Sequence, residues 1–200
     1  MNKKGLIESL LWQEEGTSLD FKREQYRFSG EVEGVKSELL KDILAFANAW
    51  RQTNAHILIG VKEVQGRKSE IIGIESHIDD AILQEFVNKK TNKPIVFSYE
   101  AITIDDSKVA LITIPVQPRP FYVKKNYGRV IADKIYLRRG SSTDIASLDE
   151  VMEMGKSVTK QEINSPILTE FFIIGEEAVA PTGRLLLGHP ELTLVNLTLI

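Results

Sequence analysis

Cysteine is absent from this chain of 200 residues. Its absence excludes a disulfide framework, a thiolate zinc site and a cysteine nucleophile. Histidine is scarce, and His56, His77 and His189 lie far apart without the spacing of metal ligands. We therefore expect the histidines to be structural.

Long apolar runs are missing as well. No stretch approaches the roughly 20 residues that cross a bilayer, and the first residues lack the uninterrupted apolar region of a signal peptide. The composition, 42% hydrophobic and 26% charged, is typical of a globular domain with its own core. We expect a cytoplasmic protein without a membrane partner.

Charge is unevenly distributed, although the formal net charge is only -3. Residues 119–139 hold seven basic residues and a single acid, Asp133, whereas residues 144–177 hold eight acids and two lysines. The basic block suits phosphates and the acidic block would repel them. A solvated surface remains the alternative for both.

Apolar periodicity predicts helices interleaved with strands. The predicted helices are 6–12, 35–50, 78–90 and 147–156, and the predicted strands are 18–22, 56–64, 69–75, 95–104 and 108–116. Residues 121–125 and 134–138 are expected to add one or two more strands. Ser147 and Glu150 have the spacing of a capping box. Asn48 ends the most periodic helix, where a buried amide would bind backbone groups. We predict an α+β fold with a mixed or antiparallel sheet packed against helices.

The last part of the chain differs in character. Residues 158–200 contain three prolines and finish in an alternating apolar run, 192–200, that needs a sheet partner. We expect residues 1–157 to form one domain. We expect residues 158–200 to be a linker followed either by the start of a truncated β-rich domain or by a strand that pairs with a second copy in a homodimer.

Three carboxylates are candidates for a site. Glu15 and Asp20 flank the start of one predicted strand, and Glu63 follows another. Carboxylates from neighbouring strands can hold a divalent metal, or they can be solvated. From the residues alone both interpretations stay open.

Several short motifs, in order, resemble the Schlafen-type AlbA domain family. They are Glu15-x4-Asp20-Phe21-Lys22, Leu44 to Asn48, Ile57 to Val61, Gly73-Ile74, Pro120 to Tyr122, and Tyr136-x-Arg138-x-Gly140-Ser141-x-Thr143. The resemblance runs from about residue 6 to residue 154. The chain departs from the family pattern in two places. Trp50 and Arg51 occupy the segment where the family has two glycines. Asp20 stands where the family has a glutamate, and Glu63 stands where it has an aspartate.

The resemblance implies functions as well as a fold. Some members of this family are metal-dependent endoribonucleases that cut transfer or ribosomal RNA with three carboxylates, and others are nucleic-acid-binding or regulatory domains. Carried over, the catalytic and metal-binding residues would be Glu15, Asp20 and Glu63, with Mg²⁺ or Mn²⁺ as the cofactor. Asp20 is one carbon shorter than glutamate, which shortens its reach to a shared metal.

The basic block supplies candidate ligands for a nucleic-acid backbone. Basic and hydroxyl side chains near glycine turns suit phosphate oxygens, and tyrosine can stack on a base. The candidates are Lys22, Lys124, Lys125, Tyr127, Arg129, Arg138, Arg139 and Ser141, of which those from 124 to 129 lie at the tip of a predicted hairpin.

These observations favour a nucleic-acid-binding module, for RNA or DNA backbone, within a larger regulatory or defence protein that supplies a C-terminal partner domain. Whether the protein is an enzyme stays open, because a metal-dependent endoribonuclease is the first alternative. The second alternative is a protein-interaction or regulatory domain that binds no nucleic acid.

Overall fold

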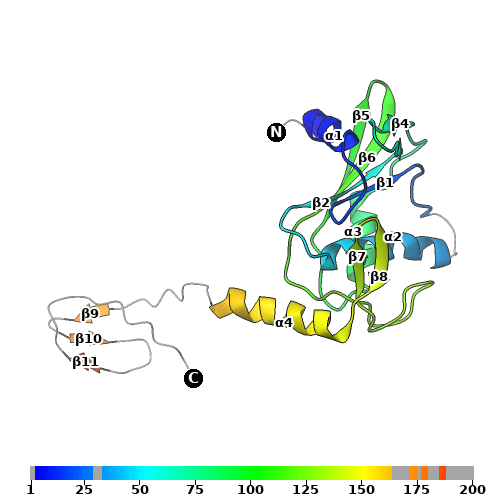
Figure 1. Cartoon of the computed structure of the whole chain (residues 1–200). Helices are drawn as coiled ribbons and strands as arrows, with labels where there is room; N and C mark the ends of the chain where they lie inside the picture. The colour runs from blue at the N-terminus through cyan, green and yellow to red at the C-terminus, as the bar shows by residue number, and fades with distance from the viewer. Residues whose placement is uncertain (1–2, 29–32, 164–171, 175–176, 180–184, 188–200) are drawn as a thin grey trace. The chain divides into compact units, whose positions relative to one another are not determined.

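The chain forms two compact units, Met1–Thr159 and Lys160–Ile200, in this computed structural model. The structure describes residues 3–28, 33–163, 172–174, 177–179 and 185–187 (Figure 1). Within that part of the chain no helix is both long enough and apolar enough to cross a membrane.

The first unit is built on a mixed sheet of four strands in the order β1-β2-β6-β5. The edge strand β1 (Leu19–Lys22) runs parallel to β2 (Ala55–Ile59). The long hairpin of β5 (Ser98–Ile104) and β6 (Ser107–Ile114) is antiparallel, and β6 also pairs antiparallel with β2. The predicted mixed sheet is confirmed.

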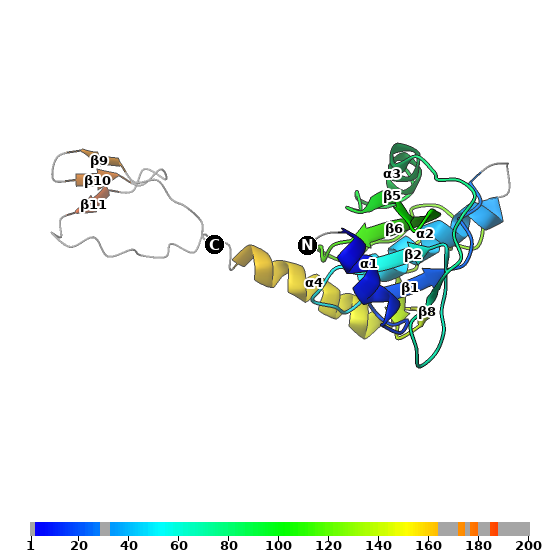
Figure 2. The same cartoon turned by 90° about the horizontal axis from the view of Figure 1, so that it is seen from above.

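Helices cover both faces of this sheet, and the alternation of side chains along the strands decides which residues face which helix. Leu58 belongs to the cluster of α1 (Lys3–Leu11). Its neighbours Ile57 and Ile59 belong to the cluster of α2 (Glu33–Asn48) and α3 (Asp80–Asn88). Figure 2 shows α3 beside β5. The result is the predicted α+β architecture.

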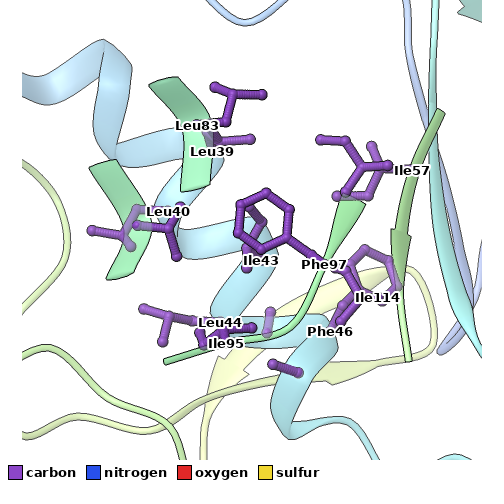
Figure 3. Packing of buried hydrophobic residues seen from close by; sticks show 14 of the residues in the cluster. Leu39, Leu40, Ile43, Leu44, Phe46, Ile57, Leu83, Ile95, Phe97 and Ile114 are labelled. Atoms are coloured by element: carbon purple, nitrogen blue, oxygen red, sulfur yellow. The ribbon is translucent and has the colours of Figure 1, made fainter. Parts of the chain in front are cut away.

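The larger cluster lies between α2 and the sheet. Figure 3 shows Leu39, Ile43 and Phe46 from α2 packed with Ile57 and Ile114 from the strands. All five side chains are fully buried. Burying one such side chain contributes about 1.5–3 kcal/mol, so α2 is fixed firmly against the sheet.

Asn48, the last residue of α2, joins that helix to two other segments. Its Nδ2 donates to the carbonyl oxygens of Phe121 at 2.8 Å and Tyr136 at 3.0 Å. Its Oδ1 accepts from the N–H of Phe121 at 2.8 Å. The amide is completely buried, and the prediction that it binds backbone groups is confirmed.

A two-stranded sheet comes after the main sheet in the chain. The hairpin of β7 (Tyr136–Arg139) and β8 (Ser142–Ile145) leads into α4 (Leu148–Ile163). The capping box is formed, because Ser147 Oγ accepts from the N–H of Glu150 and Glu150 Oε2 accepts from the N–H of Ser147. A second short hairpin joins β3 (Val61–Lys62) and β4 (Glu70–Ile71).

The segments 121–125 and 134–138, from which one or two strands were expected, supply only one, β7. Residues 121–125 form no strand, and only Val123 makes an isolated bridge, to Thr91. The reason is that other partners take the backbone groups: the N–H of Phe121 goes to Asn48, and the N–H of Tyr122 goes to Asn92 Oδ1. Conversely, β8 was not predicted.

In the second unit, β9 (Phe172–Ile174), β10 (Glu177–Val179) and β11 (Leu185–Leu187) form an antiparallel sheet in the order β11-β10-β9. The apolar run 192–200 lies outside the described residues. Its role as a strand of a truncated domain or of a homodimer stays a prediction.

Candidate nucleic-acid interface

Asp20 lies on the inner face of β1, under α2. Leu19 and Phe21 pack into the α1 cluster, so the alternation of the strand directs Asp20 and Lys22 to the opposite side. Asp20 is only 3% exposed. A carboxylate buried this deeply needs charged or hydrogen-bonding partners.

Arg138 provides the first partner. Its Nη2 lies 2.7 Å from Asp20 Oδ1, and its Nε donates to the carbonyl oxygens of Gly16 at 3.2 Å and Gly140 at 3.1 Å. The guanidinium also lies over the ring of Phe46, 4.9 Å from its centroid. Predicted as a phosphate ligand, Arg138 is instead 6% exposed and its guanidinium is engaged inside the fold.

Lys22 is shared between two carboxylates. Its Nζ lies 2.8 Å from Asp20 Oδ2 and 3.0 Å from Asp42 Oδ2. The first contact has the distance of an ion pair but lacks hydrogen-bond geometry, so Asp20 Oδ2 is a buried oxygen without a hydrogen bond from the described residues. Tyr26 OH donates to Asp42 Oδ2 at 2.7 Å.

Burial and charge act against each other in this network. Burial raises the pKa of Asp42, although Lys22 and the Tyr26 hydroxyl oppose the rise. Burial lowers the pKa of Lys22, but the carboxylates of Asp42 and Asp20 outweigh it, and the net direction is up. The raised pKa of Asp42 disfavours its charged form and therefore the ion pair, whereas the raised pKa of Lys22 favours the ion pair. Because two donors meet Asp42 Oδ2, we take the pair as charged near neutral pH.

Glu15 and Glu63 lie beside this network. Glu15 Oε1 accepts from the N–H of Phe21 at 3.0 Å, and Glu63 Oε1 accepts from the N–H of Glu15 at 3.1 Å. Burial, together with the charges of Asp20 and Glu63, raises the pKa of Glu15. The three predicted carboxylates are therefore close enough to sense one another.

A shared metal does not fit this arrangement. Asp20 is held by Arg138 and Lys22, and Arg138 Nη2 is also 3.8 Å from Glu15 Oε2. Two cations thus stand where a divalent ion would need unoccupied carboxylate oxygens. Among the described residues, no group of three His, Asp or Glu side chains is arranged to hold a metal ion.

A groove of about 600 Å³ opens next to the network, between the segment after β1 and the first half of α2. Its basic lining residues are Lys22, Arg23, Arg27, Lys41 and Arg129. Its acidic lining residues are Glu24, Glu38 and Asp42. The cations therefore outnumber the carboxylates.

The loop that carries Arg129 is fixed to α2 by a tight turn. Tyr127 and Val130 bridge each other, and the N–H of Arg129 donates to Ser37 Oγ at 3.1 Å. A Cβ on Gly128 would lie 2.6 Å from the carbonyl oxygen of Glu33, and φ there is +54°, so the position requires glycine. The expected hairpin tip is thus a loop docked on α2.

The other predicted ligands have different surroundings. Lys124 and Lys125 are exposed, and their side chains form no ion pair with any described residue. Tyr127 is half-buried against Phe86, with ring centroids 5.4 Å apart, and Lys90 Nζ lies 4.3 Å from its centroid. Its ring is therefore already used within the fold.

Arg139 and Ser141 lie at the end of the β7–β8 hairpin. Both nitrogens of the Arg139 fork contact the carboxylate of Glu150 at 2.7 Å. Ser141 is exposed in the turn. Arg139 thus helps to hold the start of α4, and Ser141 stays a predicted ligand.

Sequence patterns did not indicate several residues of this region. Asp42 and Tyr26 were missed because a single acid on an amphipathic helix and a tyrosine in a polar segment are typical of ordinary surfaces. Arg23, Arg27 and Lys41 were missed for the same reason. The one available signal was the pair of arginines within the polar segment after β1.

Comparisons with known proteins agree with this architecture. No curated protein matches the chain. The solved structure of the DIP2311 protein from Corynebacterium diphtheriae is similar over 77% of this chain, with 19% identity and a TM-score of 0.50, and the match covers 28% of that protein. This likeness concerns the fold.

A second solved structure is the N-terminal domain of a protein from Nitrosomonas europaea that is named for a relation to the ATP-dependent DNA helicase RecG. It has 14% identity, covers 70% of this chain and 93% of its own, and has a TM-score of 0.38. The family model described as Schlafen, AlbA_2 matches residues 15–147. Because that match spans well over half of the chain, the protein belongs to the Schlafen AlbA_2 family.

Proposed function

We propose that the domain binds nucleic acid through its phosphate backbone and serves as a recognition module of a larger protein. The observation that carries the proposal is the excess of cations around the groove beside α2. Sequence-independent affinity for nucleic acids comes mainly from lysine and arginine near phosphates.

The carboxylates of the groove already have partners. Asp42 is held by Lys22 and Tyr26, and Glu38 Oε1 lies 3.3 Å from Arg129 Nη1. By contrast, Arg23 and Lys41 have no carboxylate partner among the residues described. The net field of the groove is therefore positive and suits an anionic chain.

The loop that follows the groove extends this surface. Lys124 and Lys125 are exposed on the same loop as Arg129. The loop is tied to α2 through Ser37 and Gly128, so Arg129 is held at the groove, and Lys124 and Lys125 lie four and five residues before it in the chain. We infer that a phosphate backbone lying along the groove continues onto these lysines.

Salt dependence tests the proposal directly. We expect the triple variant Lys124→Gln, Lys125→Gln, Arg129→Gln to bind labelled nucleic acid more weakly. The slope of log affinity against log salt should fall by up to about three units, since each lost phosphate contact removes about one unit. Fluorescence anisotropy over a salt series measures both quantities.

The matched control removes the same charge from another turn. Lys62→Gln, Arg67→Gln, Lys68→Gln changes the β3–β4 hairpin, where Glu70 and Glu8 already pair with the cations. This variant should bind like the parent. An unchanged slope in the loop variant, or no salt-dependent binding by the parent, contradicts the proposal; the second result favours the protein-interaction alternative.

A metal-dependent endoribonuclease is the second candidate. The closeness of Glu15 to Asp20 and Glu63 favours it: burial is the main cause of the raised pKa of Glu15, and the charges of these two carboxylates add to the rise. The ion pairs of Asp20 with Arg138 and Lys22 oppose it. Incubation of the chain with labelled transfer RNA, with and without Mn²⁺, separates the two candidates: cleavage that depends on Mn²⁺ and is lost in Glu63→Gln supports the nuclease, and intact RNA contradicts it.

A further inference from the structure

An exposed tryptophan stands at the end of α2, in the segment 49–55. Trp50 is 39% exposed even though the guanidinium of Arg119 lies over its ring, with Cζ 3.8 Å from the ring centroid. A large aromatic ring that is stacked on one side and still accessible to solvent is a platform on which a second flat group can stack.

Among the described residues, the hydrogen bonds of Arg119 and Arg51 all go to carbonyl oxygens. Arg119 Nη1 donates to the carbonyls of Asn48 at 3.2 Å and Ala49 at 3.1 Å. Arg51 Nη2 donates to the carbonyl of Pro115 at 2.9 Å, and Arg51 Nε donates to that of Phe46 at 3.0 Å. These bonds cap the carbonyl end of α2 and fix both side chains.

One edge of the Arg119 guanidinium makes no hydrogen bond within the part of the chain that the structure describes. Its Nε and Nη2 donate to none of the residues that the structure describes. That edge is the fork with which arginine binds a phosphate through parallel hydrogen bonds.

Arg51 and Arg119 lie in stretches of the chain without carboxylates. Residues 43–62 and 107–132 contain no Asp or Glu. Burial, with the charge of Arg119, lowers the pKa of Arg51 to about 10, and burial also lowers that of Arg119. Both guanidiniums are charged at neutral pH, and neither has an anion among the described residues.

We propose that Trp50 and Arg119 form a binding site for single-stranded nucleic acid, in which a base stacks on Trp50 and its phosphate binds the Nε–Nη2 edge of Arg119. The inference rests on the proposed function and adds a substrate class to it. Bases of a duplex are stacked on one another and cannot reach an exposed ring, whereas those of a single strand can. The site therefore distinguishes the two forms.

Tryptophan fluorescence offers a direct test. Trp12 is exposed and directly follows α1, and Trp12→Phe leaves Trp50 as the single reporter. The probes are a fluorescein-labelled oligodeoxythymidylate, an abasic strand of the same length, and a duplex. We expect the oligodeoxythymidylate to quench Trp50, and the other two probes to quench it little.

Substitution measures the contribution of the ring. Trp50→Ala should weaken binding of the oligodeoxythymidylate on the order of tenfold, the usual effect of losing one stacked base, and leave the abasic strand unaffected. Trp50→Phe keeps an aromatic face and should retain most of the affinity. Arg119→Lys keeps the charge but lacks the fork, so it should weaken binding of both the oligodeoxythymidylate and the abasic strand. Thermal melts of each variant verify that it is folded.

The outcomes separate this inference from the proposed function. If the oligodeoxythymidylate binds without quenching Trp50 and Trp50→Ala binds as the parent does, the site is wrong while the groove remains. If Trp50→Ala weakens binding of the abasic strand as much as binding of the oligodeoxythymidylate, the proposed base stacking is wrong. If neither strand nor duplex binds in a salt-dependent manner, the proposed function fails as well.

Discussion

At the scale of single residues, Arg138 joins two turns that are far apart in the chain. Its guanidinium bonds the carbonyls of Gly16 and Gly140 while it neutralises Asp20. Removing one partner of a buried ion pair leaves an uncompensated charge, which costs about 3–5 kcal/mol. The contribution of this side chain is therefore structural, and it holds the β7–β8 hairpin against the start of β1.

Replacement of Arg138 tests that role. We expect Arg138→Met to lower the free energy of unfolding by about 3–5 kcal/mol, because Asp20 keeps only Lys22 as a cation. Adding Asp20→Asn removes the carboxylate charge that Arg138→Met leaves unpaired. The double variant should therefore lose less free energy of unfolding than the sum of the losses in the two single variants. Urea denaturation gives all four values. Simple additivity would contradict a direct coupling of these two side chains.

Glu15 gives a prediction that depends on pH. Its pKa is raised above 4.5, chiefly by burial, so the folded state holds the proton more tightly than the unfolded chain. Ionising Glu15 therefore lowers stability as the pH rises through and above that value. Glu15→Gln keeps an oxygen for the N–H of Phe21 and removes this cost.

We expect Glu15→Gln to match the parent at a pH below 4.5 and to become more stable than the parent as the pH rises toward neutral. Unfolding midpoints measured over a pH series provide the comparison. A variant that loses stability only at neutral pH would mean that the ionised carboxylate is stabilised, as a cation bound there would do.

At the scale of secondary structure, the start of α4 depends on one glutamate. Glu150 completes the capping box with Ser147 and receives both nitrogens of the Arg139 fork, and these hydrogen bonds lower its pKa to about 2. A depressed pKa contributes stability above the ordinary value of 4.5 that is lost as the pH falls toward 2. Solvent screening keeps this contribution below about 1 kcal/mol.

Replacement of Glu150 should therefore lower the stability of the fold at neutral pH and leave it unchanged in acid. We expect Glu150→Gln to be less stable than the parent near neutral pH and equal to it once Glu150 is protonated in both states. Ser147→Ala should lose about 0.5–2 kcal/mol at either pH, because its hydroxyl does not titrate. Helix content followed by circular dichroism during urea denaturation distinguishes these patterns.

Periodicity explains which elements could be predicted. The apolar repeat of α2 and the buried run of β2 are local signals. The helix was predicted within two residues of its observed bounds, whereas the predicted strand 56–64 is divided at Gly60 into β2 and β3. The strand β8 is mostly exposed and has no alternation, so it carried no signal. Residues 121–125 have the composition of a strand, but the side chain of Asn48 takes the N–H that a ladder would use.

The site was predictable to a smaller extent for a related reason. A charged residue inside an apolar strand indicated Asp20. Its partners Arg138 and Asp42 come from β7 and α2, and no local pattern links them to β1. The sequence also could not show that Arg138 is buried, because arginine next to a glycine turn has the same composition at a surface.

At the scale of the whole molecule, the second unit raises the question of assembly. A homodimer through the apolar run 192–200 stays a prediction. It implies that the full chain is a dimer and that a version ending at Thr159, the boundary of the first unit, is a monomer. Light scattering on both chains is the measurement. Two monomers would contradict the pairing and favour part of a neighbouring domain.

The buried amide of Asn48 has a consequence for how this surface can change over evolution. The backbone of segment 121–135 is bonded to the side chains of Asn48, Asn92 and Ser37, and its own side chains Phe121, Val123 and Val130 are buried in the core. Such attachment does not depend on the identity of the outward side chains. The exposed side chains Lys124, Lys125 and Arg129 can therefore be exchanged to suit a different ligand while the sheet beneath stays the same.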